Sequence, residues 1–254
     1  MKRSNIIIIS AVILFSSWLM LSVWLQGNAF NVIKSGKSCS YANIISNDSI
    51  KRLQLHSFKN IKIDFEKSTE QLKLAILYSK KQEFSCSNGL KRAITYSVSG
   101  DTLYLSINYL TWQGEDFINI GVPSLVSVTL TSDPNNKGWS SRNNTMTTIS
   151  GFIANTLFIN NNSKFQLQLN NNQLKKLELK GDLSDIGNVE ITDFADYDSL
   201  DVDIQGKHGT LSLKSYNSRL NENQKQWISI KVPRTFRIEA DASIFLASKI
   251  TIKK

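Results

Sequence analysis

Short apolar pairs recur at nearly constant distance through residues 157–213, and this recurrence restricts the possible folds more than any other feature of the chain. The pairs follow one another every eleven or twelve residues, at Leu177/Leu179, Val189/Ile191, Leu200/Val202 and Leu211/Leu213. Taken two steps apart, two series have a period near 22: Leu157, Leu179, Val202 and Leu167, Val189, Leu211. Such a period is typical of stacked coils, each of which buries its apolar face only against its neighbours.

The gaps between the pairs are rich in Asn, Asp and Gly, as in "NNNS", "NNNQ" and "QGKHG". These residues tolerate the positive φ angles that tight corners demand. An antiparallel sandwich also places strands every eight to twelve residues. Its hairpins favour two-residue Asn-Gly turns, which this stretch lacks, and the gaps here are longer and uneven. The pattern therefore favours a parallel β-solenoid and leaves a sandwich as the alternative.

Upstream of the repeat, period-two alternation continues from about Lys51, and helical periodicity is hard to find. "IKIDF" places Ile61, Ile63 and Phe65 on one face, and "LKLAILY" does the same for Leu72, Leu74 and Ile76. We therefore predict an all-β protein with a single parallel β-solenoid (β-helix-like) over residues 51–254.

The N-terminus carries a membrane-targeting signal. Lys2 and Arg3 precede twenty residues, Ile6–Leu25, that contain no charge. That length is about what a helix needs to cross the hydrocarbon core, and the basic start predicts that the rest of the chain is exported. Residues 1–29 are predicted to form a membrane anchor and residues 30–50 a tether. A signal peptide cleaved after Ala29 is the alternative, because "GNA" is a small-x-small site.

Export changes the interpretation of the two cysteines, Cys39 and Cys86. Outside the cytoplasm two such cysteines can form a disulfide, and the alternative is two buried thiols that never meet.

The net charge of +9 comes from scattered single and paired Lys and Arg residues, which are typical of a solvated strand face. No basic-aromatic motif indicates nucleic acid, and no motif predicts a cofactor.

Carboxylates and tryptophans supply the candidate sites. Hard oxygen ligands of the acidic run Asp196, Asp198, Asp201 and Asp203 could hold Ca²⁺. Their spacing does not fit an EF-hand, and alternation with Leu200, Val202 and Ile204 predicts instead that Asp201 and Asp203 face solvent. Two tryptophans in polar loops, Trp112 and Trp139, are candidates to stack on a sugar ring or to anchor a partner. The alternative is that each packs its own loop against the coil.

Three segments together resemble the head GIN domain family: "GDTLYLSI", "INIGVPSLVSVTLTSD" and the rungs that end in "LSLKSYN". The resemblance covers about residues 53–252 and implies an exported bacterial protein of the autotransporter-adhesin head type, with successive β-coils and no catalytic residues. Coils of that family usually turn on small Ser-Gly-Ala-Ser-like steps. Here Gly151, Gly181 and Gly206 stand near such positions beside Asn-rich corners.

These observations leave three classes of function. The leading prediction is a non-catalytic cell-envelope protein in the bacterial inner membrane, with its β-domain in the periplasm, that binds a glycan, a matrix or a protein. An enzyme acting on envelope polysaccharide would need clustered carboxylates, for which Asp182, Asp185 and Asp193 are the candidates. A membrane-anchored sensor or assembly factor is the third class, and its short cytoplasmic start would require a membrane partner.

Overall fold

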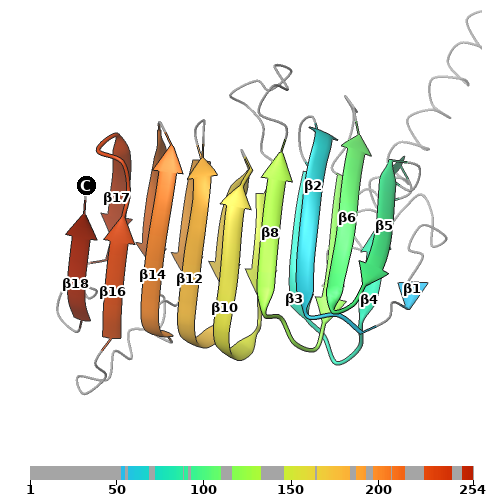
Figure 1. Ribbon diagram of the computed structural model, residues 1–254, viewed down its shortest axis with the longest axis horizontal. Coiled ribbons are helices and arrows are strands. Elements are labelled where there is room, and N and C mark those ends of the chain that lie inside the picture. The colour runs from blue at the N-terminus through green and yellow to red at the C-terminus, as the bar shows by residue number, and fades with distance from the viewer. Residues whose placement is uncertain are drawn as a thin grey trace, which may run out of the picture. The chain divides into compact units, whose positions relative to one another are not determined.

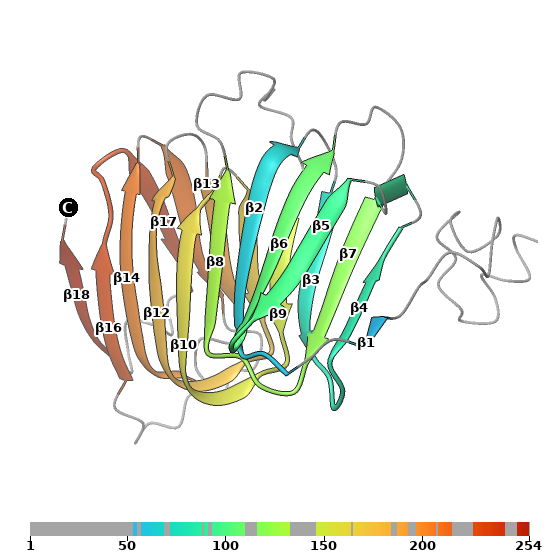
Figure 2. The ribbon, with the colours of Figure 1, turned by 45° about the vertical axis from the view of Figure 1, so that its right-hand side comes forward.

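The computed structural model describes residues 53–54, 57–68, 72–87, 89–90, 93–109, 116–132, 146–163, 165–183, 187–192, 197–206, 208–214, 226–241 and 248–253. The strands form two nine-stranded sheets packed face to face (Figures 1 and 2). Sheet A has the order β1 (Leu53–Gln54), β4 (Glu83–Cys86), β7 (Asp116–Val122), β3 (Leu72–Tyr78), β9 (Met146–Ser150), β11 (Gln166–Asn170), β13 (Gly187–Thr192), β15 (Gly209–Lys214), β17 (Phe236–Ala240). Sheet B has the order β18 (Ser248–Lys253), β16 (Gln226–Lys231), β14 (Tyr197–Gly206), β12 (Gln173–Leu183), β10 (Ile153–Asn162), β8 (Ser127–Ser132), β2 (Asn60–Ser68), β6 (Thr102–Tyr109), β5 (Ile94–Ser99).

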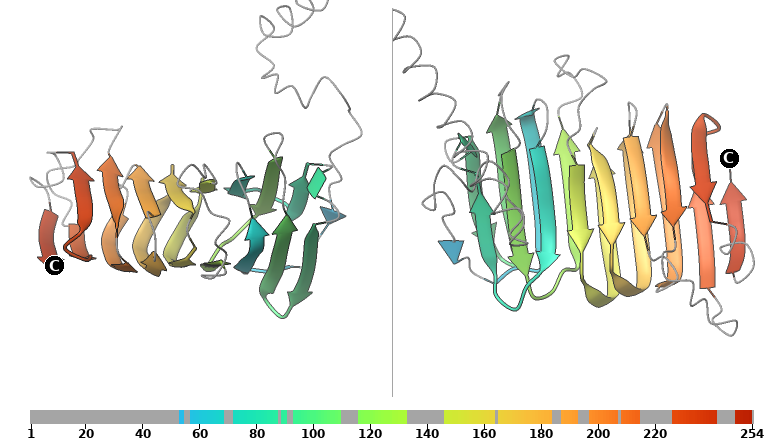
Figure 3. Two further views of the ribbon diagram at one scale, coloured as in Figure 1. Left: turned by 90° about the horizontal axis from the view of Figure 1, so that it is seen from above. Right: turned by 180° about the vertical axis from the view of Figure 1, so that it is seen from behind.

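From β8 to β18 the chain alternates between the two sheets, and each strand pairs in parallel with the strand two positions further along. One strand from each sheet therefore makes one turn of a coil, and the turns stack along the molecule (Figure 3). The all-β class and the mostly parallel pairing are confirmed. Parallel ladders exclude the antiparallel sandwich, since that fold is built from hairpins.

The apolar side chains that alternate along the strands fill the space between the sheets. On β2, Ile61, Ile63 and Phe65 are buried while Lys62 and Asp64 are exposed, as period-two alternation requires. The rings of Phe65 and Phe165 meet edge to face with centroids 4.1 Å apart, which links coils that are a hundred residues apart in sequence.

The first part of the domain departs from the predicted single parallel solenoid. Strand β2 lies between β6 and β8, and β3 lies between β7 and β9, so the first coil is an interior coil. The chain passes outward to β4–β7 and then returns past the first coil to β8. Strands β1, β4 and β5 pair antiparallel at this end of the sheets. Because these hairpin-like strands contain the same alternation as the coils, the sequence pattern could not distinguish them.

The predicted repeat is mostly confirmed in register. Leu167, Val189 and Leu211 are hydrogen-bonded neighbours across β11, β13 and β15. In sheet B, Leu179 faces Val202 as predicted, but the partner of Leu157 is Leu177. The predicted pairing of Leu157 with Leu179 is therefore wrong, because the coil from β10 to β12 takes 20 residues between paired positions and the next coil, from β12 to β14, takes 23.

Asparagine and glycine build the corners between β9, β10, β11 and β12. Gly151 and Asn171 have φ angles of 83° and 52°, in the left-handed region that these residue types tolerate. The buried amide of Asn172 connects successive turns: its Oδ1 accepts from the Phe152 N–H at 3.0 Å, and its Nδ2 donates to the Ile149 oxygen at 3.0 Å. The prediction that Asn-rich gaps form solenoid corners is confirmed here.

Among the residues that the structure describes, no helix is long and apolar enough to span a membrane. The predicted anchor at residues 6–25 and the tether at residues 30–50 lie outside the described residues, so both stay predictions.

Candidate functional site

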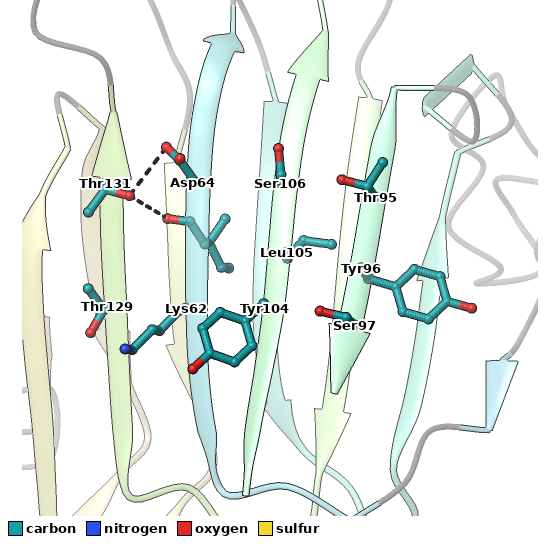
Figure 4. A pocket seen from close by; sticks show the side chains of 11 residues that line it. Lys62, Asp64, Thr95, Tyr96, Ser97, Tyr104, Leu105, Ser106, Thr129 and Thr131 are labelled. Atoms are coloured by element: carbon teal, nitrogen blue, oxygen red, sulfur yellow. Dashed lines mark hydrogen bonds between the residues drawn. The ribbon is translucent and has the colours of Figure 1, made fainter. Parts of the chain in front are cut away.

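A hollow of about 490 Å³ lies on the outer face of sheet B. Four neighbouring strands, β5, β6, β2 and β8, form its floor (Figure 4). Strands β2, β6 and β8 bury alternate residues in the core, and on the edge strand β5 Ile94 and Val98 are half-buried, so the intervening side chains point outward. The outward residues are Thr95, Ser97, Tyr104, Ser106, Lys62, Asp64, Thr129 and Thr131.

Tyr104 is the aromatic platform of the hollow. Its side chain is 42% exposed, and its cross-strand neighbours are Lys62 on β2 and Ser97 on β5. The Lys62 ammonium lies 5.5 Å from the centroid of the Tyr104 ring, within the range of a cation–π interaction. One cation therefore lies beside an aromatic face, in a position to donate hydrogen bonds to a molecule placed on that face.

Hydroxyl groups surround this platform. Thr131 Oγ1 lies 3.3 Å from Asp64 Oδ1 and 3.3 Å from the main-chain oxygen of Ile63, so it donates to one of these acceptors at a time (Figure 4).

The second aromatic residue, Tyr96, has a different role. It lies opposite Leu105 on the inward side of β5, and its ring stacks on Phe84 with centroids 5.8 Å apart. Tyr96, which is 44% exposed, therefore covers Phe84 at the edge of the core and also lines the hollow.

A smaller hollow, about 260 Å³, continues the first one along sheet B. Thr129 lines both hollows. The floor of the smaller one is formed by β8, β10 and β12, and its outward residues include Phe158, Asn160 and Lys180. Phe158 is 43% exposed, so the outer face of sheet B offers a second aromatic surface beside the first.

The charges on this face largely cancel. Lys176 pairs with Glu178, and the pKa of Lys176 is raised above its ordinary value because its ammonium donates a hydrogen bond to Glu178 and is attracted by that carboxylate. Lys231 Nζ lies 3.2 Å from Asp203 Oδ2. In the larger hollow, Lys62 and Asp64 carry opposite charges. The arrangement therefore suits an uncharged ligand rich in hydroxyl groups better than a highly charged one.

Several residues predicted from sequence fall elsewhere. Asp201 and Asp203 lie on β14 with Leu200, Val202 and Ile204 buried between and beside them, so both carboxylates are on the outer face. Asp198 is exposed at the start of the same strand, and Asp196 lies outside the described residues. In the described part of the chain, no group of three or more His, Cys, Asp or Glu side chains is placed to hold a metal ion.

The predicted disulfide and the tryptophan contacts remain predictions. Cys86 is buried on β4, whereas Cys39 lies outside the described residues. Trp112 and Trp139 also lie outside them. The sequence reasoning did not select Tyr104 or Phe158, although a signal was present: each is an aromatic residue at an outward position of an alternating strand.

A third hollow, about 300 Å³, lies on the outer face of sheet A. Amides and charged groups line it, among them Gln166, Gln168, Asn188, Glu190 and Lys214. Its described lining contains no aromatic ring, so it lacks the stacking surface that sheet B provides.

Comparison with known proteins gives structural similarity only. No model of a known protein family matches the chain, and no curated protein matches its sequence. The chain is similar to a crystal structure of a putative adhesin from Parabacteroides distasonis, with 14% identity, a TM-score of 0.48, and coverage of 80% of this chain and 78% of that one. It is also similar to putative adhesins from Bacteroides fragilis (15% identity, TM-score 0.45, 82% and 97% coverage) and Parabacteroides merdae (15%, 0.43, 82% and 96%). With TM-scores below 0.5, these similarities do not assign a function to this chain.

Proposed function

We propose that the protein is a non-catalytic, exported cell-envelope protein that binds a glycan on the outer face of sheet B. Its two-sheet coil acts as a β-solenoid that holds this face rigid, in the manner expected of an adhesin head. The charge-free segment at residues 6–25 supports anchoring in the inner membrane, with the β-domain in the periplasm. Release after cleavage at Ala29 is the alternative, and the resemblance to the head GIN domain family agrees with either.

One observation carries the proposal: the exposed Tyr104 ring lies in an open hollow surrounded by hydroxyl groups. Sugar rings present an apolar face and a rim of hydroxyls, so they are recognised by an aromatic surface with hydrogen-bonding groups around it. Thr95 and Ser97 supply such groups on the neighbouring strand β5, and Thr129 supplies one on β8, beyond β2.

The same hollow argues against a polysaccharide-cleaving enzyme. Hydrolysis of a glycosidic bond requires two carboxyl groups held on either side of the bond, roughly 5–10 Å apart. Among the described residues that line the hollow, Asp64 supplies a carboxylate and no second one accompanies it. Asp182, which the sequence suggested as a catalytic candidate, is an exposed residue of β12 outside this lining.

Binding of the detergent-solubilised full chain to immobilised neutral polysaccharides (an α-glucan, a β-glucan, a mannan and a galactan) tests the proposal. We expect binding to at least one of them. Tyr104→Ala should lower the affinity about tenfold, because an aromatic stacking contact contributes about 1.4 kcal/mol. Tyr104→Phe, which keeps the ring, should bind nearly as well as the wild type.

The matched control is Tyr78→Ala, since Tyr78 is 51% exposed but ends a strand of sheet A. Absence of binding to all four polymers, or equal losses from Tyr104→Ala and Tyr78→Ala, would contradict the proposal.

A further inference from the structure

Three large aromatic side chains are exposed on the outer face of sheet B. They are Tyr104 on β6, Phe158 on β10 and Trp227 on β16, with exposed fractions of 42%, 43% and 58%. In each case the residues on both sides in the sequence are buried, so the ring points away from the core. The three strands belong to different coils, yet their positions follow a regular order.

The strand register fixes the step from the first ring to the second. Tyr104 is level with Lys62, Lys62 with Thr129, and Thr129 with Asn160. Phe158 is two residues before Asn160 on the same strand. The step from Tyr104 to Phe158 therefore spans three inter-strand spacings, from β6 to β10, and moves two residues toward the N-terminal ends of the strands.

The step from the second ring to the third is the same. Phe158 is level with Glu178, Glu178 with Asp201, and Asp201 with Ser229. Trp227 is two residues before Ser229. Figure 1 shows the equal strand count: β2 and β8 separate β6 from β10, and β12 and β14 separate β10 from β16. The three rings therefore lie on one diagonal line at equal intervals.

Strand geometry converts these steps into a distance. Three inter-strand spacings of about 4.8 Å and two residues of about 3.3 Å place neighbouring rings about 16 Å apart, and the outer two about 32 Å apart. Equal intervals on a straight line match a ligand that is itself linear and repeating. A folded protein partner has no such period, so a polymer is the better occupant.

The side chains between the rings indicate which polymer. Thr129 and Asn160 lie between the first two platforms, and Ser199 and Ser229 lie beside the third. Lys176 and Lys231 are paired with Glu178 and Asp203, and Lys62 and Lys180 each lie two residues from an acidic residue of the same strand, Asp64 and Glu178. A surface of hydrogen-bonding groups with balanced charge is complementary to an uncharged polyol chain, whereas a polyanion would need unpaired cations.

We propose that this diagonal is an extended binding track for a long neutral polysaccharide, whose rings stack on Tyr104, Phe158 and Trp227 in turn with a few sugar units between platforms. The inference rests on the proposed glycan-binding function and adds the class and length of the ligand. Linked contacts along one rigid track act as a multivalent site, so affinity should rise with chain length until all three platforms are covered.

The test compares polymers with their disaccharides. The full chain in detergent is titrated with the α-glucan, β-glucan, mannan and galactan, with the matching disaccharides, and with the polyanion alginate. We expect at least one neutral polymer to bind tenfold or more tightly than its disaccharide. Phe158→Ala and Trp227→Ala should each weaken polymer binding severalfold and leave binding of the disaccharide to the Tyr104 hollow unchanged. Tyr78→Ala should change neither.

The outcomes separate the two proposals. Equal affinity for polymer and disaccharide, or polymer binding that only Tyr104→Ala reduces, would overturn the track and leave glycan binding at the hollow intact. Binding to none of the neutral polymers would overturn both, and binding to alginate alone would show in addition that the ligand is a polyanion. Thermal unfolding of each variant, expected to match the wild type because the three rings are on the surface, verifies that the fold is retained.

Discussion

Replacing Gly181 by alanine adds one methyl group where β12 lies against the main chain of β10. An ideal Cβ at this position would lie 2.0 Å from the main-chain oxygen of Asn161 and 2.7 Å from its carbonyl carbon. Carbon–oxygen contacts normally stay beyond about 3.3 Å, so the two strands would have to separate locally by more than about 1 Å. The opposing group is main chain and cannot rotate away. The φ angle of Gly181 lies outside the left-handed region, so the close approach alone requires glycine.

The expected loss of stability follows from this contact. Overpacking typically costs about 1–3 kcal/mol, and a weakened ladder hydrogen bond adds about 1 kcal/mol. Alanine restores about 0.5 kcal/mol through the lower entropy of the unfolded chain, which leaves a net loss of about 1.5–3.5 kcal/mol. For a domain of this size that corresponds to a decrease in melting temperature of roughly 3–14 °C. Circular dichroism at the β-sheet minimum measures it.

Gly121→Ala is the matched control, because Gly121 is also a strand glycine and is buried in β7. Its Cβ would meet Glu83 Cγ at 2.8 Å and Ser79 Cβ at 3.0 Å, and the Glu83 side chain can turn aside. We expect a loss within about 1 kcal/mol. Two results would contradict the claim that contact between β12 and β10 requires glycine at position 181. One is a Gly181→Ala variant that melts within 2 °C of the wild type, and the other is a Gly121→Ala variant that loses more stability than Gly181→Ala.

Three further outcomes are expected. Asn172→Ala removes the side-chain hydrogen bonds to the Phe152 N–H and the Ile149 oxygen and should lower the free energy of unfolding by about 2–4 kcal/mol in urea denaturation; a loss below 0.5 kcal/mol would refute the corner ladder. Lys231→Ala removes a largely exposed ion pair with Asp203 and should change stability by less than about 0.5 kcal/mol, so a loss above 1 kcal/mol would contradict this estimate. The native protein should stay in the membrane pellet through high-salt and alkaline washes, and a mature N-terminus at Phe30 would disprove the anchor.

The fold class could be predicted because the physics behind it is local. Alternation at Ile61, Ile63 and Phe65 is the pattern of a strand with one buried face, and all three side chains are buried. The spacing of Leu167, Val189 and Leu211 gave the register of three strands in sheet A, since corners of equal length keep the period constant. The predicted register was wrong at Leu157, because one coil is three residues shorter than the next and the period is not constant there.

The order of the coils could not be predicted, because pairing between β2 and β8 joins residues nearly seventy positions apart. Alternation predicts that a strand has an inner face but does not predict which strands lie beside it.

The candidate site could not be predicted for the same reason. Tyr104, Lys62 and Thr129 are far apart in the sequence and meet only through that non-local order. Sequence reasoning looked instead for aromatic residues in loops, Trp112 and Trp139.

The interior position of β2 also determines how the domain bears a mechanical load. A pull on the segment that precedes residue 57 reaches β2 after the short β1, and β2 is hydrogen-bonded along its length to β6 on one side and β8 on the other. Tension along the axis of that strand must shear two ladders at once, whereas an edge strand can be peeled away one bond at a time. Rupture under force is governed by the unfolding rate, which falls when many bonds must break together. If the N-terminus is anchored and a glycan is held on sheet B, the force path between them runs through a strand that ladders on both sides hold in place.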